Sequence, residues 1–338
     1  MRASEHMSRA NGEQAAMSTP SLEPMVLAWV ERALRGEQVV AMARLRGGYV
    51  NENIAITTDG GRYVLRRYRR DAGMKSASRT CAIEAALARR LASTAVPIAE
   101  VIAADAAGTE ASQPLLLARY VDGVAIKAAV ANVGGSAAEE IGWAAGTTLA
   151  AIGTVNFPHG GCFTGADLVP SPEGMPGSLD EFVESCLQRG HAARVMTESE
   201  LASLRSLAAR LAPAAASTAS ARQLVHSDYN GKNLLAIKGG GRWSISAVLD
   251  WEFAFSGSPL TDIGNMLRFH AEYPPGFASG FITGYRDAGG KLPPDWREVS
   301  EALDLYALAD FLSRPPEHPY FAKAVSLIRE RLGRNGAA

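Results

Sequence analysis

The feature that most constrains the fold of this chain is the segment between residues 224 and 252. It reads Leu-Val-His-Ser-Asp-Tyr-Asn-Gly-Lys-Asn-Leu-Leu and, after a short gap, Ala-Val-Leu-Asp-Trp-Glu. Two apolar runs bracket a polar loop, which predicts a strand, a loop and a second strand. Within the segment, His226, Asp228, Asn233 and Asp250 follow the spacing H-x-D-x-x-x-x-N and then a later Asp. A bare H-x-D is common, but the full spacing between apolar strands rarely arises by chance.

These residue types suit the transfer of a γ-phosphoryl group to a hydroxyl. That transfer needs a carboxylate at the attacking hydroxyl and oxygen ligands for the Mg²⁺ that bridges the phosphates. Asp228 is the predicted base. Asn233 and Asp250 are the predicted metal ligands, since Mg²⁺ keeps several waters and needs few protein oxygens. Lys232 is a further candidate to reach the γ-phosphate, with a solvated lysine as an equal alternative. The simplest alternative for the whole segment is a loop whose polar residues only cap turns.

Two residues are predicted to support this loop rather than to react. His226 is expected to hold the backbone through hydrogen bonds. Asp262 lies at the start of a predicted helix, where the helix dipole favours a carboxylate, and this position is compatible with bracing the loop. Trp251 and Phe253 flank Glu252 and are predicted to be core residues.

Composition sets limits on the class of protein. The chain has 338 residues, a net charge of −1, 47% hydrophobic and 20% charged residues, which indicates an ordinary globular protein of two domains or two lobes. No apolar run approaches the ~20 residues that span a bilayer. Three widely spaced cysteines suggest neither a disulfide framework nor a zinc site. We therefore expect a cytoplasmic protein with no membrane partner, as a monomer or a homodimer, with a disordered leader over residues 1–20.

The periodicity of the remaining chain predicts an α+β fold of two lobes. The N-terminal lobe, residues 21–121, is expected to hold a small antiparallel sheet and a helix, with helices over 22–35 and 75–95 and strands over 39–45, 54–58, 63–66, 98–104 and 115–120. The C-terminal lobe, residues 122–335, is expected to be mainly helical, with strands only beside the 226–233 loop. Its helices are predicted over 136–152, 178–189, 198–216, 261–270, 277–288, 295–312 and 320–332. Asp122-Gly123 is the predicted joint.

A glycine pair near the start of the sheet is a candidate phosphate-binding turn. Gly47 and Gly48, followed by Asn51, allow close backbone approach and direct N–H groups at a phosphate. The run is neither a full G-x-G-x-x-G nor a Walker A loop. A plain hairpin is the alternative.

The basic run Arg-Arg-Tyr-Arg-Arg at residues 66–70 supplies the predicted phosphate cation. Strand alternation sends Arg66 and Tyr68 to one face and Arg67 and Arg69 to the other. Arg66 is the predicted contact for the α- and β-phosphates, and Glu84 on the next helix is its expected partner. The other arginines of the run are expected to be solvated. Because the chain is nearly neutral overall, we expect no nucleic-acid partner.

Together these residues resemble the aminoglycoside phosphotransferase and choline kinase-like family, a branch of the protein-kinase-like fold. The resemblance covers about residues 30–315. Within this range it includes the segment Pro-Leu-Thr-Asp-Ile-Gly at 259–264. It implies a bilobal fold with ATP, or alternatively GTP, between the lobes and adenine against the linker at Ala118, Tyr120 and Val121. It matches Asp228 to the catalytic Asp of the family and Asn233 and Asp250 to its Mg²⁺ ligands.

Two positions depart from that pattern. Ser227 stands where the family often has Gly, and its small side chain is expected to be tolerated. Arg66 stands where Lys is common, and a guanidinium binds phosphate with a different, bidentate geometry. Neither departure is interpreted as loss of activity.

The sequence thus predicts an ATP- and Mg²⁺-dependent kinase that phosphorylates a hydroxyl of a small molecule, such as an aminoglycoside-like or other hydroxylated antibiotic. A polycationic substrate requires a carboxylate-rich pocket. The candidate substrate residues are Glu252, Glu272, Asp304, Asp310 and Glu317, with a solvated acidic helix face as the alternative. A metabolic kinase for an amino alcohol, sugar or nucleoside-like compound is the other main hypothesis, and a nucleotide-binding pseudoenzyme is the third.

Overall fold

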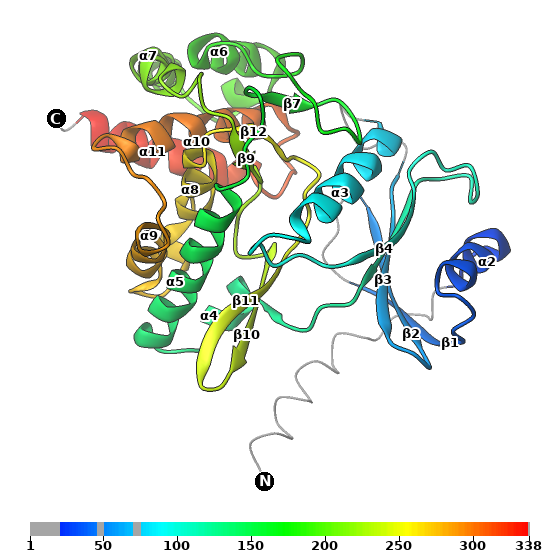
Figure 1. Cartoon of the computed structure of the whole chain (residues 1–338). Helices are drawn as coiled ribbons and strands as arrows, with labels where there is room; N and C mark the ends of the chain where they lie inside the picture. Colours follow the sequence, from blue (N-terminus) through cyan, green and yellow to red (C-terminus); the bar gives the residue numbers. More distant parts are fainter. Residues whose placement is uncertain (1–20, 46–50, 70–75, 337–338) are drawn as a thin grey trace.

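The computed structural model describes residues 21–45, 51–69 and 76–336, which form two lobes (Figure 1). The smaller lobe contains one antiparallel sheet, built from β1 (Val39–Arg44), β2 (Glu52–Thr58), β3 (Arg62–Arg67), β4 (Val101–Asp105) and β5 (Leu115–Arg119). Its strand order is β1-β2-β3-β5-β4. The leader expected over residues 1–20 lies outside the described residues.

A helix covers each face of this sheet. α2 (Pro24–Ala33) packs Trp29 and Val30 against a face that includes Ile54 and Leu65. α3 (Ala77–Leu91) covers the other face and buries Cys81 and Ala85 there. Because neighbouring residues of a strand point to opposite faces, burial of Leu65 under α2 places the next side chain of β3 on the α3 side. That next residue is Arg66, which therefore points to the face that α3 shares with the larger lobe.

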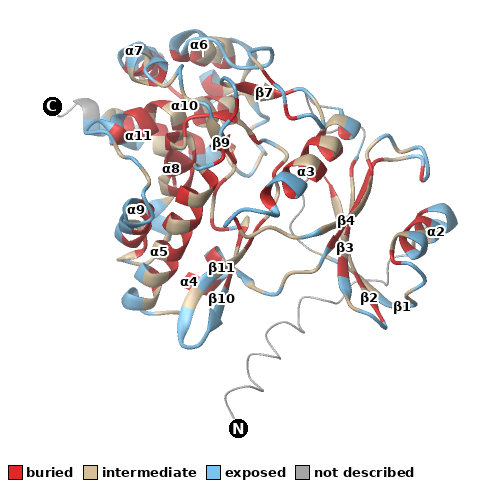
Figure 2. Cartoon of the chain, viewed as in Figure 1, coloured by how far each residue is buried: buried red, intermediate tan, exposed pale blue. Residues whose placement is uncertain are grey.

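The larger lobe is mainly helical, as predicted. Its helices are α4 (Ile126–Val130), α5 (Gly135–Ile152), α6 (Leu179–Arg189), α7 (Glu198–Ala216), α8 (Leu260–Leu267), α9 (Phe277–Asp287), α10 (Trp296–Ser313) and α11 (Phe321–Gly336), with short 3-10 turns η1 (Ala192–Arg194) and η2 (His270–Glu272). Figure 2 shows that the buried residues concentrate where these helices face one another and where α3 meets them. Ile83, Leu87 and Leu91 of α3 belong to the core of this lobe, so α3 joins the two lobes.

This lobe also contains seven strands among the described residues, of which only the two beside the 226–233 loop were predicted. They are β6 (Val124–Ala125), β7 (Gly161–Phe163), β8 (Pro170–Ser171), β9 (Gln223–Val225), β10 (Leu234–Gly239), β11 (Arg242–Val248) and β12 (Phe255–Gly257). They form two sheets, β11-β10-β6 and β8-β7-β12-β9. The two strands beside the 226–233 loop thus belong to different sheets. Strands of two or three residues are too short to show an alternating pattern, so periodicity misses them.

The predicted helices are confirmed in position to within a few residues. The predicted α+β arrangement in two lobes is confirmed as well. No helix among the described residues is long and apolar enough to cross a membrane.

Glycines let α5 and α9 pack at backbone contact. A Cβ added at Gly142 or Gly146 of α5 would lie 2.2 or 2.0 Å from a carbonyl oxygen of α9. A Cβ at Gly280 or Gly284 of α9 would lie 2.1 Å from a carbonyl oxygen of α5. Paired glycines four residues apart on each helix therefore form one seam, and a side chain at any of the four would force the helices apart.

Replacing Gly146 with alanine is expected to destabilise the protein by about 1–3 kcal/mol, because overpacking displaces the backbone. Gly333 in α11 is the matched control, since an added Cβ there meets nothing within 4 Å. Gly333→Ala should be neutral or stabilising by up to ~1 kcal/mol, because alanine favours the helix. Urea denaturation of both variants measures the difference. Equal stability of Gly146→Ala and the parent protein would contradict the close seam.

Candidate active site

His226 joins the 226–233 loop to the segment that carries Asp250. Its Nε2 lies 2.9 Å from the carbonyl oxygen of Leu249, and the backbone N–H of Asp228 lies 3.2 Å from its Nδ1. The first contact needs a proton on Nε2 and the second needs a bare Nδ1, so the imidazole is neutral. Burial lowers the pKa of His226 to about 4, which agrees with that state. Both ring nitrogens are used on the backbone, and the ring positions the loop without taking a proton.

Two polar side chains of α8 hold the start of the loop. Asp262 accepts hydrogen bonds from the backbone N–H groups of His226 and Ser227 at 2.8 and 2.7 Å. Asn265, one turn later, donates its side-chain N–H to the carbonyl oxygen of Ser227 at 3.0 Å. Ser227 has a φ of +69°, a left-handed conformation that costs a non-glycine residue free energy. The clamp from α8 stabilises this conformation.

Asp228 lies at the centre of the loop and its carboxylate accepts two hydrogen bonds. Asn230 donates to Oδ1 at 2.8 Å, and Asn233 donates to Oδ2 at 2.7 Å. Burial raises the pKa of the Asp228 carboxyl to about 6, against the lowering effect of Asn233. Since the Asn233 amide nitrogen is used on Asp228, a metal would bind this side chain through its oxygen.

Arg66 reaches from β3 of the small lobe to the carboxylates of the D-W-E segment. One of its terminal nitrogens lies 2.6 Å from Asp250 Oδ1 and 3.3 Å from Glu252 Oε2. The same nitrogen lies 3.4 Å from Glu84 Oε1 on α3. Oxygen atoms of the three carboxylates lie within 4.8 Å of one another. We call Arg66, Glu84, Asp250 and Glu252 the Arg66 cluster.

Neighbouring side chains fix the carboxylates of this cluster. The Tyr68 hydroxyl donates to Glu84 Oε2 at 2.7 Å, and the Asn51 amide donates to Glu252 Oε2 at 2.9 Å. Asp250 itself has a φ of +67°, so both acidic segments of the site include a residue in the left-handed region.

The electrostatics of the cluster reflect an excess of negative charge. Burial raises the pKa of Glu84 to about 7, with Arg66 opposing the shift and Asp250 adding to it. Burial and the Asp250 charge raise the pKa of Glu252. Burial lowers the pKa of Arg66, but its carboxylate neighbours outweigh burial and leave that pKa raised. Three buried or half-buried carboxylates face one guanidinium, a donor set of hard oxygens that suits Mg²⁺.

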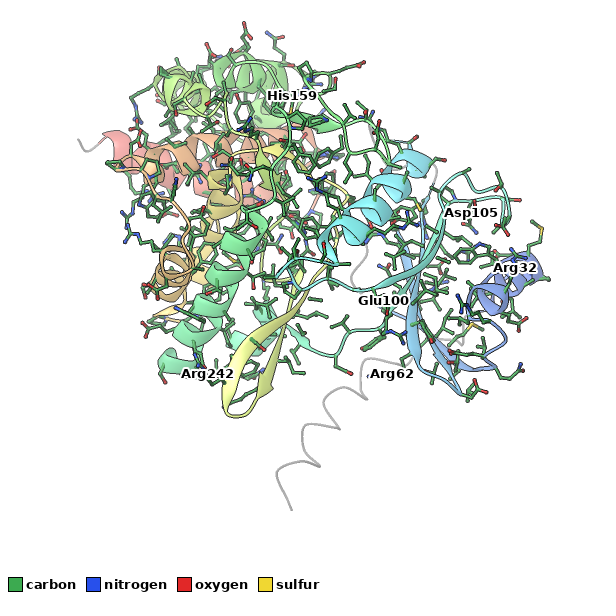
Figure 3. All side chains as sticks on the ribbon, viewed as in Figure 1. Arg32, Arg62, Glu100, Asp105, His159 and Arg242 are labelled. Carbon is green, nitrogen blue, oxygen red and sulfur yellow. The ribbon has the colours of Figure 1, made fainter. Side chains whose placement is uncertain are left out.

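The other predicted nucleotide residues lie in the small lobe and at the joint. Ala118 is buried in β5, where it pairs with Val64 and Val101. Tyr120 follows β5, and Arg62 lies over its ring at 4.5 Å. Figure 3 labels Arg62, the first residue of β3. A terminal nitrogen of Arg62 lies 2.6 Å from Asp122. Val121 lies between Tyr120 and Asp122 in the chain. Gly47 and Gly48 lie outside the described residues.

The Lys232 side chain contacts Tyr320. Its Nζ donates to the hydroxyl of Tyr320 and lies 4.8 Å from the centre of that ring. Lys232 thus extends from the loop that contains Asp228 toward Tyr320 of the larger lobe.

Two predictions about the surroundings are wrong. Arg67 is not solvated: its side chain is 14% exposed and pairs with Glu23 and Glu52, because Glu52 lies directly opposite it on β2. Phe253 is 53% exposed and is not a core residue, since the chain turns between β11 and β12. Trp251 is buried as predicted.

The predicted acidic substrate wall does not assemble. Asp304 is buried and bridges Arg268 and Arg331 at 2.7 and 2.6 Å, so it ties α10 to α8 and α11 and cannot face a substrate. Asp310 pairs with Arg314 one helical turn away. The other three predicted substrate residues lie in different places. Glu252 belongs to the Arg66 cluster, and Glu272 pairs with two lysines. Glu317 is exposed in the connection before α11.

The sequence analysis did not predict four contacts of the site. These are the hydrogen bonds from Asn51 to Glu252, from Tyr68 to Glu84 and from Asn265 to Ser227, and the ion pair between Glu252 and Arg66. A signal existed for two of them. Strand alternation places Tyr68 on the face of Arg66, and Asp262-x-x-Asn265 is the spacing that puts two side chains on one helix face.

A profile of the phosphotransferase enzyme family matches residues 41–302. This span contains the 226–233 loop, the α8 clamp and the Arg66 cluster. The chain belongs to the phosphotransferase enzyme family. The predicted resemblance is confirmed at this level, and the protein is an enzyme of the phosphotransferase class. Comparison with curated proteins finds no match.

Solved structures show the same fold. The chain resembles a thermostable mutant of aminoglycoside phosphotransferase APH(4)-Ia in ternary complex with AMP-PNP and hygromycin B, with TM-score 0.62, 21% identity, and coverage of 91% of this chain and 99% of that one. It also resembles the streptomycin–ATP–APH(2")-IIa ternary complex (TM-score 0.60, 13% identity, 92% and 97% coverage). A candidate fructosamine-3-kinase from Thermobifida fusca YX-ER1 follows (TM-score 0.58, 16% identity, 88% and 96% coverage). These similarities confirm the predicted protein-kinase-like fold.

Ser227→Gly is expected to leave the protein equally stable or to stabilise it by up to ~1 kcal/mol, because glycine adopts positive φ without strain. Ser206 is the matched control, since it lies within α7 and is exposed. Ser206→Gly should destabilise by roughly 0.5 kcal/mol, because glycine disfavours a helix. Thermal unfolding of the two variants gives the comparison. A Ser227→Gly protein destabilised more than Ser206→Gly would show that the serine side chain itself, not its backbone, matters here.

Proposed function

We propose that this phosphotransferase moves the γ-phosphoryl group of ATP to a hydroxyl of a small molecule. The observation that carries the proposal is the position of Asp228, with its carboxylate held by Asn230 and Asn233 in a loop that His226 ties to the Asp250 segment. The structural neighbours support the nucleotide, since two of their complexes contain AMP-PNP or ATP together with a small hydroxylated compound.

Asp228 would orient the acceptor hydroxyl and take its proton. With a pKa of about 6, its carboxylate is ionised at neutral pH and is a stronger base than an exposed Asp. General-base catalysis works best when the pKa of the base lies near the working pH. The hydrogen bonds from Asn230 and Asn233 hold the carboxylate in one orientation.

Asp250 would hold Mg²⁺, together with the amide oxygen of Asn233 and, from its place in the Arg66 cluster, Glu252. The excess of carboxylates over cations in this cluster fits a divalent ion. When bound, Mg²⁺ neutralises charge on the β- and γ-phosphates. Arg66 would contact the α- and β-phosphates, with Glu84 and Tyr68 holding it in place.

The boundary between the two lobes would lie between residues 121 and 122, and each lobe would supply a different part of the site. β5 ends at Arg119 in the small sheet, and β6 pairs with β10 of the larger lobe. The small lobe would contribute Arg66, while the larger lobe would contribute Asp228 and the metal ligands. Adenine would lie against the connection near Ala118, Tyr120 and Val121.

Asp228→Asn should reduce kcat by at least about 10²-fold, because the amide cannot accept the proton. Nucleotide binding should change little, since Asp228 contacts the acceptor side. Isothermal titration with ATP and Mg²⁺ measures the binding, and release of ADP measures the turnover. Asn230→Ser is the comparison variant, since it removes one hydrogen bond but leaves the carboxylate. Near-parental kcat in Asp228→Asn would overturn the assignment.

Arg66→Lys should raise the KM for ATP and lower kcat, because lysine keeps the charge but loses the planar fork. Arg67→Lys should be nearly silent in catalysis, since Arg67 points to Glu23 and Glu52 on the opposite face. Steady-state kinetics with ATP as the varied substrate separates the two. Equal effects at both positions would mean that the basic run acts only through its bulk charge.

A further inference from the structure

One nitrogen of Arg66 lies at the meeting point of the three carboxylates in the Arg66 cluster. This Nη2 is 2.6 Å from Asp250 Oδ1, 3.3 Å from Glu252 Oε2 and 3.4 Å from Glu84 Oε1. A cation that touches the same three oxygens must lie between them, which is the position of this nitrogen. Because like charges at such a separation repel strongly, Arg66 and a divalent ion are alternative occupants of the meeting point.

The oxygens around the meeting point form a set that a divalent ion can use. Ligand atoms of Glu84, Asp250 and Glu252 all lie within 4.8 Å of one another, and Mg²⁺ and Mn²⁺ both favour carboxylate oxygens. Burial is the main cause of the raised pKa of Glu252, and the charges of Asp250 and Asp228 add to it. Negative charge therefore extends from the cluster to the proposed base.

Two of these carboxylates are also held by contacts that do not involve Arg66. The Tyr68 hydroxyl donates a hydrogen bond to Glu84 at 2.7 Å. The side-chain amide of Asn51 donates one to Glu252 at 2.9 Å. If the guanidinium left the meeting point, these contacts would keep both carboxylates in position for another cation.

The guanidinium of Arg66 is not fully used at the meeting point. Among the described residues, nothing accepts a hydrogen bond from its Nε, although this atom is buried. A buried donor without an acceptor costs free energy. Nε and Nη2 lie side by side on the planar guanidinium, and such a pair of donors matches two oxygens of a phosphate. A phosphate would therefore satisfy Arg66 better than the carboxylates do.

We propose that Arg66 is an exchangeable counter-ion that makes metal binding depend on nucleotide binding. Arg66 occupies the meeting point and keeps a divalent ion away from Asp250 and Glu252. When a nucleotide binds, its phosphates accept hydrogen bonds from Nε and Nη2 of Arg66. Arg66 then leaves Asp250, and the carboxylate oxygens become available to the metal. This inference rests on the proposed function, in which Arg66 contacts the α- and β-phosphates.

Binding of Mn²⁺ to the protein without nucleotide tests the exchange, with electron paramagnetic resonance to measure the free ion. Arg66→Gln should bind Mn²⁺ at least about tenfold more tightly than the parent protein, because a positive charge is removed from the position of the metal. No gain in affinity would overturn the proposal.

Arg67→Gln is the matched control for the loss of one positive charge. Arg67 is the next residue, and its side chain is 14% exposed against 13% for Arg66. It pairs with Glu23 and Glu52 on the opposite face of the strand. Arg67→Gln should leave the Mn²⁺ affinity unchanged. Equal gains in the two variants would mean that bulk charge, and not the position of Arg66, controls the metal, which also overturns the proposal.

Thermal unfolding keeps the test decisive if Arg66→Gln is unstable. The substitution takes a guanidinium away from three buried or half-buried carboxylates, which destabilises the fold. Mn²⁺ alone should then raise the unfolding temperature of Arg66→Gln more than that of the parent protein, because the ion binds the folded state. Equal shifts in the two proteins would contradict the exchange.

A second substitution locates the bound ion. Asp250→Asn in the Arg66→Gln background should reverse the gain in Mn²⁺ affinity, because an amide does not neutralise a cation. Asp287→Asn in the same background is the control, since Asp287 is exposed at the end of α9 and accepts a hydrogen bond from Trp143. It should keep the gain. A gain that survives Asp250→Asn would place the ion outside the Arg66 cluster and overturn the proposal.

Nucleotide binding is measured separately, by isothermal titration of AMP-PNP in the presence of Mg²⁺. If the parent protein binds AMP-PNP but Arg66→Gln gains no affinity for Mn²⁺, the exchange is wrong and the proposed function stands. If the parent protein does not bind AMP-PNP, the proposed function fails, and the transfer of Arg66 to a phosphate fails with it.

Discussion

The two hydrogen bonds from the backbone of residues 226 and 227 to Asp262 are the interactions on which the site depends. They hold Ser227 at a positive φ, which turns the chain so that His226 points back to Leu249 while Asp228 faces Asn230 and Asn233. His226 then fixes both Asp228 and the segment that leads to Asp250. A single carboxylate on α8 thus sets the relative positions of Asp228, the proposed base, and the segment of Asp250, the proposed metal ligand.

The ion pairs of the Arg66 cluster connect the small lobe to the larger lobe. Glu84 comes from α3, Arg66 from β3, and Asp250 and Glu252 from the larger lobe. Taking carboxylates out of water is costly unless each is matched, and one guanidinium does not match three. The raised pKa values of Glu84 and Glu252 express that mismatch. A bound divalent cation would relieve it, which couples metal binding to the approach of the two lobes.

How far the sequence alone predicts this site depends on the distance along the chain over which each contact is made. Asp228 and Asn233 lie in one short loop, so their spacing already implies contact. Arg66 and its face follow from strand alternation, a local rule. Glu252 as a partner of Arg66 joins residues far apart in sequence, and no local pattern encodes it. The pairing of Arg67 with Glu23 also joins residues far apart in the sequence. Periodicity does not reveal such a contact, so the prediction that Arg67 is solvated was wrong.

The packing of α5 against α9 constrains the chain next to Asp228. Glycines bring the two backbones into contact, and at this seam the carbonyl oxygen of Ala145 accepts a hydrogen bond of 2.8 Å from the buried hydroxyl of Tyr229. Tyr229, the residue after Asp228, is therefore anchored to a helix backbone, which leaves it little freedom for change. Lys127, Glu272 and Lys323 are instead half-exposed and pair with one another at the ends of long side chains. A substitution among these three changes the charge of the surface but keeps the Tyr229 anchor, so the position of the loop is constrained far more strictly than the charge around it.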